Sequence, residues 1–506
     1  MLLPTILLLG ALCLTFLALQ NIRQRLRRRQ DAKRWGCQAP LRVPSGFFGI
    51  STFLDTVKAQ QETRLVEFIL DRYNKYGLTF QQTMLGLSSI STIEPENLKA
   101  LLATQFNDFG LGTRHREFYP TLGDGIFTLD GAGWSHARAM LKPQFHRDQV
   151  ADLDLLDAHV TRLIDLVPKD GSIFDIQRLF FLLTIDSATH FLFGESVGSM
   201  DDNSVLGKSS VGDAQNFADV FNTAMKYLNL RSISLGFYWM VNPKKFRDAN
   251  RRVHEVVDYY VYKAIEAKRN PEKKEPGRYI FADGLAAETE DPKVLRDNML
   301  NILLAGRDTT ASLLSSAFFF LARHPTVWDK LRHVVVEEFG DSQNPKGDIT
   351  HARLKNVLYL RYVLNEVLRL LPPVPLNFRV AVKDTTLPVG GGPNGKSPIF
   401  VKKGQPILYS VYAMHRRKDL YGPDADSFRP ERWENAKRGW EYLPFNGGPR
   451  ICLGQQYALT EASYTMVRLI QRFSSVENGE PDLEKPVILS NLTMSHGAEG
   501  VKIRLY

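Results

Sequence analysis

The stretch FNGGPRICLGQQ, residues 445–456, contains one of only three cysteines in a chain of 506 residues. Around this cysteine, Cys452, the motif F-x-x-G-x-R-x-C-x-G places one aromatic residue, two glycines and one arginine: Phe445, Gly448, Gly454 and Arg450. Glycine removes the Cβ atom where a flat group must approach the backbone, and arginine can pair with an acidic group. The phenylalanine can shield the sulfur from water. A cysteine that only packs needs none of these neighbours, so the stretch predicts a thiolate that ligates a metal.

The residues after this loop predict a helix. Residues 455–473, QQYALTEASYTMVRLIQRF, form a long amphipathic pattern, so Cys452 lies just before a helix N-terminus. The unpaired amides and the dipole of a helix N-terminus favour a thiolate. A single thiolate in such a loop is typical of the axial ligand of haem iron.

The composition is that of a large globular protein, with 44% hydrophobic and 24% charged residues. Three cysteines without a CxxC pair argue against a disulfide framework and against a cysteine-rich zinc site, and they fit a reducing compartment. The net charge is +9, but residues 23–34, RQRLRRRQDAKR, supply six of these charges. The rest of the chain has no basic excess large enough to predict nucleic-acid binding.

The N-terminus predicts a membrane anchor. Residues 2–19, LLPTILLLGALCLTFLAL, are eighteen apolar or small residues, which as a helix span about 27 Å, close to the hydrocarbon core of a bilayer. A cleaved signal peptide, the alternative, has its charges before the apolar run, whereas here they follow it. We therefore predict a transmembrane anchor over residues 1–20, a basic segment and proline-containing linker over 21–49, and one cytosolic domain over 50–506.

Helical patterns dominate residues 50–370, and the strand-like pieces are short and late: LPVGG, PIFV, PVILS and the C-terminal VKIRLY. Residues 174–194 are apolar enough to suggest a second span, but they contain Asp175, Arg178 and Asp186, which favours a buried core helix. The predicted fold is mostly α-helical with small β-sheets.

One stretch of the sequence matches the pattern of a phosphate-binding loop only by coincidence. GGGPNGKS, residues 390–397, matches the phosphate-binding loop G-x-x-x-x-G-K-S. That loop requires a helix starting at its Lys-Ser, but Pro398 follows directly and disfavours a helical conformation before it. The sequence predicts a glycine-rich hairpin loop instead.

Three further motifs carry candidate functional residues. Glu366 and Arg369 are three residues apart on one predicted helix face, and FRPERW adds Arg432; an exposed surface pair is the alternative. GWSHARAML places Trp134 and Arg138 four residues apart, where both can reach one carboxylate.

The third motif, NILLAGRDTTAS, lies in a long apolar helix predicted from about residue 296 to 322. It contains Gly306, Asp308 and Thr309, a combination that predicts a local opening of the helical hydrogen-bond ladder; a helix N-cap is the alternative.

These four motifs, in the order in which they occur along the chain, resemble the cytochrome P-450 superfamily over nearly the whole chain. The resemblance implies haem b as cofactor, with Cys452 as its thiolate ligand, and a structural ion network of Glu366, Arg369 and Arg432. It implies that Asp308 and Thr309 deliver protons during oxygen activation. It also implies haem contacts from a further set: Trp134, Arg138, Ala305, Gly306, Arg379, Phe445, Arg450 and Gly454.

Longer stretches, among them AGRDTTASLL and LNEVLRLLPPVPLNFRVAV, are similar to the fungal n-alkane-inducible cytochromes, which hydroxylate terminal positions of alkanes and fatty acids. Two positions depart from that family: Leu371 replaces a common tyrosine, which bears on the substrate, and Trp433 replaces the more general phenylalanine. Ala305 stands where some fatty-acid hydroxylases carry a glutamate that esterifies the haem, so non-covalent haem is expected.

The resemblance implies NADPH-cytochrome P-450 reductase as electron donor, cytochrome b5 as a further candidate partner, and the endoplasmic reticulum membrane as location. The alternative within the class is a tailoring monooxygenase that oxidises a methyl group of a fungal polyketide or terpenoid. A haem-thiolate isomerase or dehydratase, and a haem carrier without catalysis, are disfavoured because Asp308 and Thr309 are both present. Terminal oxidation requires a narrow apolar channel, and the candidate walls are Phe118, Phe127, Leu129, Ile302, Ala305, Val374, Leu376, Leu492 and Met494.

Overall fold

The computed structural model describes residues 2–145, 153–200, 214–234, 236–270, 279–436, 439–497 and 499–506. The chain divides into two compact units. The first comprises Met1–Phe53, Arg72–Gly110 and Phe378–Tyr409, and the second comprises Leu54–Asp71, Leu111–Asn377 and Ser410–Tyr506. The predicted site residues other than Arg379 all belong to the second unit.

The first unit is built on a six-stranded sheet of order β1-β2-β3-β9-β6-β4. Its strands are β1 (Leu41–Arg42), β2 (Thr79–Met84), β3 (Leu87–Thr92), β4 (Phe109–Gly110), β6 (Leu376–Ala381) and β9 (Pro406–Ser410). The prediction that strands come only late in the chain is wrong, because β2 and β3 form an antiparallel hairpin over residues 79–92. Leu85 and Gly86 close this hairpin with φ of 45° and 79°, a two-residue turn whose backbone suits the strand twist.

The glycine-rich stretch that resembles a phosphate loop is a hairpin, as predicted. Strands β7 (Thr385–Gly391) and β8 (Ser397–Val401) pair antiparallel on either side of it. Residues 392–396 form the connection, and no helix follows Lys396 and Ser397. The backbone therefore lacks the strand-loop-helix context that phosphate binding requires.

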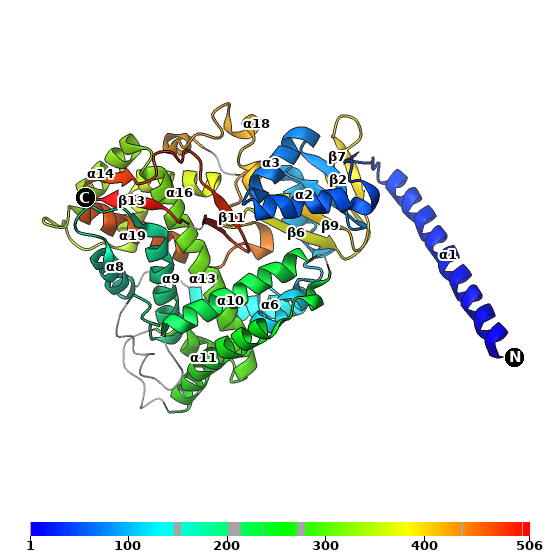
Figure 1. The fold of residues 1–506 in the computed structure, drawn as a ribbon, viewed down its shortest axis with the longest axis horizontal. Coiled ribbons are helices and arrows are strands. Elements are labelled where there is room, and N and C mark those ends of the chain that lie inside the picture. Colours follow the sequence, from blue (N-terminus) through cyan, green and yellow to red (C-terminus); the bar gives the residue numbers. More distant parts are fainter. Residues whose placement is uncertain are drawn as a thin grey trace. The chain divides into compact units, whose positions relative to one another are not determined.

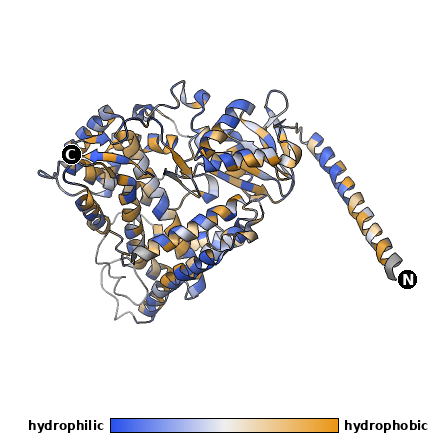
Figure 2. Cartoon of the chain, in the orientation of Figure 1, coloured by the Kyte–Doolittle hydropathy of each residue, from blue (hydrophilic) through white to orange (hydrophobic). Residues whose placement is uncertain are grey.

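Helix α1 (Leu2–Arg34) is continuous through the apolar run and the basic block. Figure 2 shows its hydropathy changing along its length, from hydrophobic near the N-terminus to hydrophilic near the basic end. The predicted transmembrane anchor over residues 1–20 is not supported: within the described part of the chain, no helix has the length and apolar character that crossing a membrane requires. The basic end of α1 is fastened within the first unit, since the Arg28 guanidinium lies 2.9 Å from the Asp384 carboxylate.

Helices make up most of the second unit (Figure 1). The longer ones are α5 (Arg114–Leu122), α6 (Gly131–Leu141), α8 (Asp154–Leu166), α9 (Ile176–Phe193), α10 (Ala214–Ile233), α11 (Lys244–Arg269), α12 (Phe281–Glu288), α13 (Pro292–Leu321), α14 (Pro325–Phe339), α16 (Leu358–Leu370) and α19 (Gln455–Arg472). Its strands are short: β5 (Phe174–Asp175), β10 (Val476–Asn478), β11 (Ile488–Ser490), β12 (Met494–His496) and β13 (Lys502–Leu505). The predicted class, mostly helical with small sheets, is confirmed.

Helix α9 is the buried core helix that its sequence predicts. The Asp175 carboxylate caps it by accepting from the amide of Gln177, and Asp186 accepts from the amides of Ser199 and Met200. Gly194 ends the helix in the left-handed conformation, with φ of 76°. The two aspartates that argued against a membrane span are thus hydrogen-bonded within the protein, and Arg178 is exposed.

Helix α13 passes through two apolar clusters of the second unit. Residues Leu295–Leu304 pack with α10, α11 and α12, whereas Ala311–Leu321 pack with α9, α14, α16 and α19. Residues 305–310, AGRDTT, belong to neither cluster. The long helix therefore holds its polar segment at a fixed place between two hydrophobic cores, whose burial stabilises it on both sides.

Candidate active site

The loop before α19 holds Cys452 in a defined backbone. Asn446 and Gly448 both adopt positive φ, 63° and 66°, and the Cys452 amide donates to the Phe445 carbonyl at 3.0 Å. Gly454 is the N-cap of α19. Glycine adopts such a positive φ at little cost, so the loop conformation itself favours glycine at position 448, whether or not a ligand lies close to it.

The Cys452 side chain presents accessible surface although protein atoms surround it closely. This desolvation raises the pKa of the Cys452 thiol, while the Gly454 amide and the charge of Arg138 oppose the rise. Conversely, burial lowers the pKa of Arg138, and the nearby thiol opposes that shift. Because the protein by itself favours a neutral thiol, a bound cation would be the group that keeps this sulfur deprotonated.

Trp134, Arg138 and Arg450 form one cluster. The Trp134 ring lies between two guanidinium groups, 5.8 Å from Cζ of Arg138 and 4.4 Å from Cζ of Arg450. Arg450 also donates to the Leu129 carbonyl at 2.9 Å and to the Asp130 carboxylate at 2.7 Å. Two cations and an indole N–H at one place form a donor set suited to carboxylates.

Arg379, a further residue predicted to contact haem, lies on β6 in the first unit. It is 3% exposed, and its guanidinium donates to the Phe378 carbonyl at 2.8 Å. Its role stays a prediction.

The structure brings Glu366, Arg369 and Arg432 into one buried network. Arg369 donates to both oxygens of Glu366, at 2.9 and 2.8 Å, and Arg432 donates to Oε1 at 3.2 Å. Glu366 and Arg369 are fully buried, so the alternative of an exposed surface pair is wrong. Arg369 also donates to the carbonyls of His415 and Ala425, which ties α16 to the segment before the cysteine loop.

The tryptophan that replaces the more general phenylalanine takes part in this network. The indole Nε1–H of Trp433 donates to Oε2 of Glu366 at 2.9 Å, an interaction that phenylalanine cannot make. The other departure, Leu371, is 1% exposed and belongs to the apolar cluster of α14, α16 and α19. Leu371 is thus a core residue.

The expected opening in the long helix is absent, because residues 292–321 are helical throughout. The Thr309 hydroxyl donates to the Ala305 carbonyl at 2.7 Å, four residues back, and so adds to the ladder rather than interrupting it. The N-cap alternative is also wrong, since Asp291 caps this helix.

Asp308 is a largely but not fully buried carboxyl, 14% exposed, beside Arg307, whose Nη1 lies 3.2 Å from its Oδ1. Burial raises the pKa of Asp308, and the charge of Arg307 opposes this rise. Oδ1 of Asp308 accepts no hydrogen bond from the described residues. A desolvated carboxyl binds a proton more readily than an exposed aspartate does.

The candidate channel walls are only partly brought together. Phe118, Phe127, Ile302 and Leu492 belong to one apolar cluster, which also includes Leu453, the neighbour of Cys452. Met494 is 1% exposed and packs in the other cluster, and its role as a channel wall stays a prediction. Leu129, Val374 and Leu376 are partly buried.

Sequence analysis missed the residues that fasten the segment before α6 to α13. The Asn301 amide donates to the Leu122 carbonyl at 3.0 Å, and its oxygen accepts from the Phe127 amide at 3.1 Å. Asp297 accepts from the Asp124 amide at 2.9 Å. The sequence did contain a signal for these contacts: Asp297 and Asn301 are four residues apart in an apolar helix, and buried polar side chains need hydrogen-bond partners.

A buried carboxyl on α19 was also missed. The Ser187 hydroxyl donates to Glu461 at 2.5 Å, and burial raises the pKa of Glu461 to about 7 despite this hydrogen bond.

The residues around Cys452 fit a haem. A Cβ atom added at Gly454 would meet only Phe145, at 3.6 Å, and one added at Gly306 would meet only Ala188, at 3.9 Å. The protein's own packing therefore requires neither glycine, which leaves room for a flat group beside both. The side chains also fit a haem, because a cysteine sulfur is a suitable ligand of iron and the Trp134 cluster can bind the haem carboxylates.

Comparison with known proteins identifies the family. The family model described as Cytochrome P450 matches residues 44–496. The chain is 53% identical to cytochrome P450 52A12 of Debaryomyces hansenii over 484 residues, which cover 94% of this chain and 93% of that protein. It is 50% identical to cytochrome P450 52A3-A of Candida maltosa (92% and 91% covered) and 48% identical to cytochrome P450 52A6 of Candida tropicalis (97% and 95%).

Of the three cysteines, Cys452 alone falls inside the matched region, since the others are Cys13 and Cys37. Its loop, the Trp134 cluster and the polar segment of α13 are the parts that a haem-thiolate enzyme needs. The chain therefore belongs to the cytochrome P450 family, monooxygenases that bind haem b through a cysteine thiolate.

Proposed function

We propose that this enzyme hydroxylates the terminal methyl group of long-chain alkanes or fatty acids, using dioxygen and electrons from NADPH. The observation that carries the proposal is the apolar cluster beside the cysteine loop, which contains Phe118, Phe127, Ile302 and Leu492. An apolar lining suits an unbranched hydrocarbon chain. The identity of about half of all positions with 52A members supports a related substrate class.

Cys452 is the proposed axial ligand, and non-covalent haem b is the proposed cofactor form. The bound haem supplies the oxidising chemistry, helped by electron density from the thiolate. Arg138, Arg450 and Trp134 hold its carboxylates in this proposal, with Arg379 as a further donor. The network of Glu366, Arg369 and Arg432 holds α16 and the segment before the cysteine loop in a fixed relative position. This keeps the Cys452 sulfur in place.

The proposed cellular context is the endoplasmic reticulum membrane, with residues 50–506 as the catalytic part facing the cytosol. NADPH-cytochrome P450 reductase is the proposed electron donor, and cytochrome b5 is a second candidate. Purified enzyme reconstituted with the reductase, NADPH and dodecanoic acid tests the activity directly. Formation of an ω-hydroxy acid is expected, and its absence with every alkane and fatty acid tested would contradict the proposed substrate class.

Asp308 and Thr309 are proposed to supply protons for oxygen activation. Thr309→Ala removes the hydroxyl that donates to the Ala305 carbonyl, and with it a proton-bearing atom of α13. NADPH oxidation should continue while peroxide rises, and product formed per NADPH should fall by roughly ten- to a hundredfold. The measurement is the ratio of product and peroxide to NADPH consumed.

Thr309→Ser is the matched control, because it keeps the hydroxyl and loses only a methyl group. The serine variant should couple NADPH oxidation to product almost as well as the unchanged enzyme. Equal coupling in the alanine and serine variants would assign proton supply to another group.

Terminal selectivity is proposed to come from the shape of the channel, since internal C–H bonds are weaker than terminal ones. Leu376 is partly buried at the start of β6. Leu376→Ala should raise the ratio of ω−1 and ω−2 products to ω product by about tenfold, the effect of a small change of shape in an apolar pocket. Gas chromatography of the hydroxylated acids gives this ratio, and Leu358→Ala, an exposed position outside the proposed channel, should leave it unchanged.

A further inference from the structure

Glu461 on α19 is a buried acidic residue that has no part in the proposed reaction. It is 3% exposed, and the helices around it contribute to the apolar cluster that includes Ala462 of α19, Leu183 of α9 and Ala311 of α13. It forms no ion pair with a described lysine, arginine or histidine. A charge buried without a counter-ion is costly, so this carboxyl binds a proton more readily than an exposed glutamate does.

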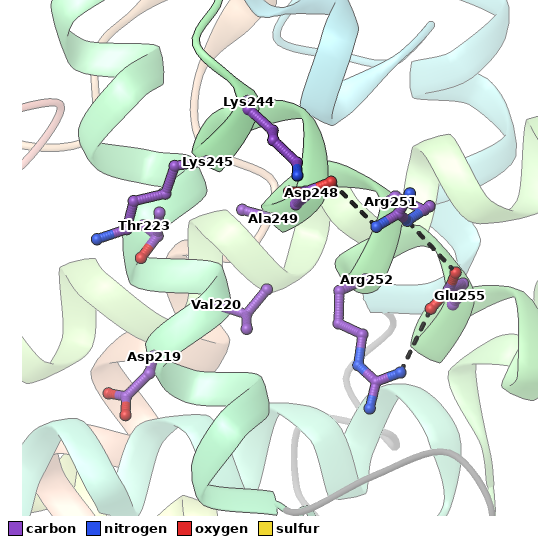
Figure 3. A pocket seen from close by; sticks show the side chains of 10 residues that line it. All are labelled: Asp219, Val220, Thr223, Lys244, Lys245, Asp248, Ala249, Arg251, Arg252 and Glu255. Atoms are coloured by element: carbon purple, nitrogen blue, oxygen red, sulfur yellow. Dashed lines mark hydrogen bonds and ion pairs between the residues drawn. The ribbon is translucent and has the colours of Figure 1, made fainter.

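Carboxylates between two other helices of this unit do have cationic partners. Helices α10 and α11 border a groove of about 860 Å³, in which Figure 3 shows Asp248 and Glu255 beside two arginines. Asp248 lies 3.0 Å from Arg251, and Glu255 lies 3.5 Å from Arg252. Both acidic side chains are also exposed to solvent, by 43% and 50%. Glu461 has neither a cationic partner nor solvent exposure, so its charge state depends strongly on any new charge nearby.

Two hydroxyl groups from neighbouring helices influence the Glu461 carboxyl. The Ser187 hydroxyl on α9 donates to its Oε1 at 2.5 Å. The Thr310 hydroxyl on α13 also favours the ionised carboxyl, although its Oγ1 makes no hydrogen bond to a described residue. Burial outweighs both hydroxyls and raises the pKa of Glu461 to about 7. Both charge states of this carboxyl are therefore populated near neutral pH.

No charged side chain of the described helices packed against α19 shifts the pKa of Glu461. Such side chains have other partners: Arg468 for Asp157 of α8, the amides of Ser199 and Met200 for Asp186 of α9, Arg307 for Asp308 of α13, Arg353 for Glu338 of α14, and Thr460 for His351 of α15 (His351–Asn356). Glu461 therefore titrates on its own within the described protein.

Glu461 lies on the helix that starts beside the cysteine ligand. Gly454 is the N-cap of α19, and Glu461 follows it by seven residues, which is about 10 Å along the helix axis. On α13, Thr310 directly follows Thr309. A unit charge at a distance of about 10 Å changes the proton affinity of a carboxyl about tenfold at an effective dielectric constant of about 20. A charge added at the haem site is therefore close enough to change the protonation of Glu461.

We propose that Glu461, with Ser187 and Thr310, is a proton-uptake site coupled to reduction of the haem iron. One electron reduces ferric iron to ferrous iron and adds one negative charge to the interior. The Glu461 carboxylate then binds one proton from solvent and becomes a carboxylic acid, so the interior gains no net charge. The only covalent bond formed in the protein is this O–H bond. The inference rests on the haem that the family binds and does not depend on the proposed substrate.

A redox titration of the full haem-loaded chain, with dithionite as reductant, tests the coupling from about pH 6 to about pH 9. Reduction raises the pKa of Glu461 above its value of about 7 in the protein. Below this range the carboxyl is protonated in both redox states, and well above it the carboxyl is ionised in both. The midpoint potential should therefore fall with rising pH only between these limits. A tenfold change in proton affinity corresponds to a total fall of about 59 mV.

Three variants assign the effect. Glu461→Gln keeps the shape of the side chain but binds no proton, so its potential should stay constant over this pH range. Ser187→Ala removes the hydroxyl that favours the carboxylate, so the fall should move to higher pH. Asp186→Asn is the matched control: Asp186 is 1% exposed on the same helix as Ser187, but two backbone amides bind its carboxylate, so the pH dependence should remain. The carbon monoxide spectrum checks that each variant holds haem.

Infrared difference spectra of the unchanged protein test the same site without any substitution. Reduction near neutral pH should increase the absorbance of a protonated carboxyl, and isotope-labelled glutamate should shift this band, whereas bands of aspartates and haem carboxylates stay in place. Ser187→Ala should shift the band too, because its hydroxyl is bonded to this carboxyl.

The results that would overturn the proposal are distinct from these. They are a potential that does not change with pH in the unchanged protein, a pH dependence that survives in Glu461→Gln, and a carboxyl band that the glutamate label does not shift. Loss of the pH dependence in Asp308→Asn but not in Glu461→Gln would assign the proton uptake to Asp308, the other carboxyl whose pKa burial raises near the site.

Discussion

Cys452→Ser is expected to abolish the thiolate-haem signal in the carbon monoxide difference spectrum and to reduce monooxygenase activity to background. The serine hydroxyl stays protonated at neutral pH, so it cannot supply the soft anionic ligand that iron needs for this chemistry. The loss should be complete, because Cys452 is the only cysteine in the region matched by the family.

The chain contains its own controls for this experiment. Cys13→Ser and Cys37→Ser remove the other two thiols, one on α1 and one directly after it, and should leave both the spectrum and the activity unchanged. A thiolate signal that survives in the Cys452 variant, or disappears in one of the controls, would assign the ligand to another cysteine.

Glu366→Gln is expected to destabilise the folded enzyme by about 3–5 kcal/mol, the cost of leaving buried cations without their anion. The two carboxylate oxygens accept from Arg369, Arg432, the Trp433 indole and the Arg429 amide. In the glutamine variant one of these acceptors becomes an N–H donor that faces other donors. Urea unfolding of the haem-loaded protein measures the loss, with reduced haem retention as a second readout.

The matched control uses an ion pair of the same spacing on the surface. Arg251 and Asp248 are also three residues apart and 3.0 Å from each other, but their side chains are 69% and 43% exposed. Asp248→Asn should cost less than about 1 kcal/mol, because solvent screens exposed pairs. Equal losses in the two variants would mean that Glu366 contributes no more than a surface charge.

Local sequence patterns predicted those features that depend on neighbouring residues. The cysteine loop, the helix after it, the core helix α9 and the hairpin at 385–401 are specified by glycines, caps and apolar spacing within about twenty residues. The network of Glu366, Arg369 and Arg432 was predictable from the resemblance, since Arg432 is far from the other two in sequence. The continuous hydrogen-bond ladder of α13 was not predictable from the sequence. The flanking apolar clusters keep residues 305–310 helical, although their local sequence disfavours a regular helix.

The tertiary structure alone decided which distant groups meet. Arg450 pairs with Asp130 across 320 residues, Asn301 and Asp297 hold the segment before α6, and Trp433 donates to Glu366. Arg231 of α10 donates to the carbonyls of Arg116 and Glu117 on α5, a contact that no local pattern encodes. The physical reason is the same in each case: burial removes water as a hydrogen-bonding partner, so each buried polar group needs a partner that only the folded chain brings within reach. Sequence by itself determined the chemistry available to this protein, and the packed fold determined which of its groups are placed to use it.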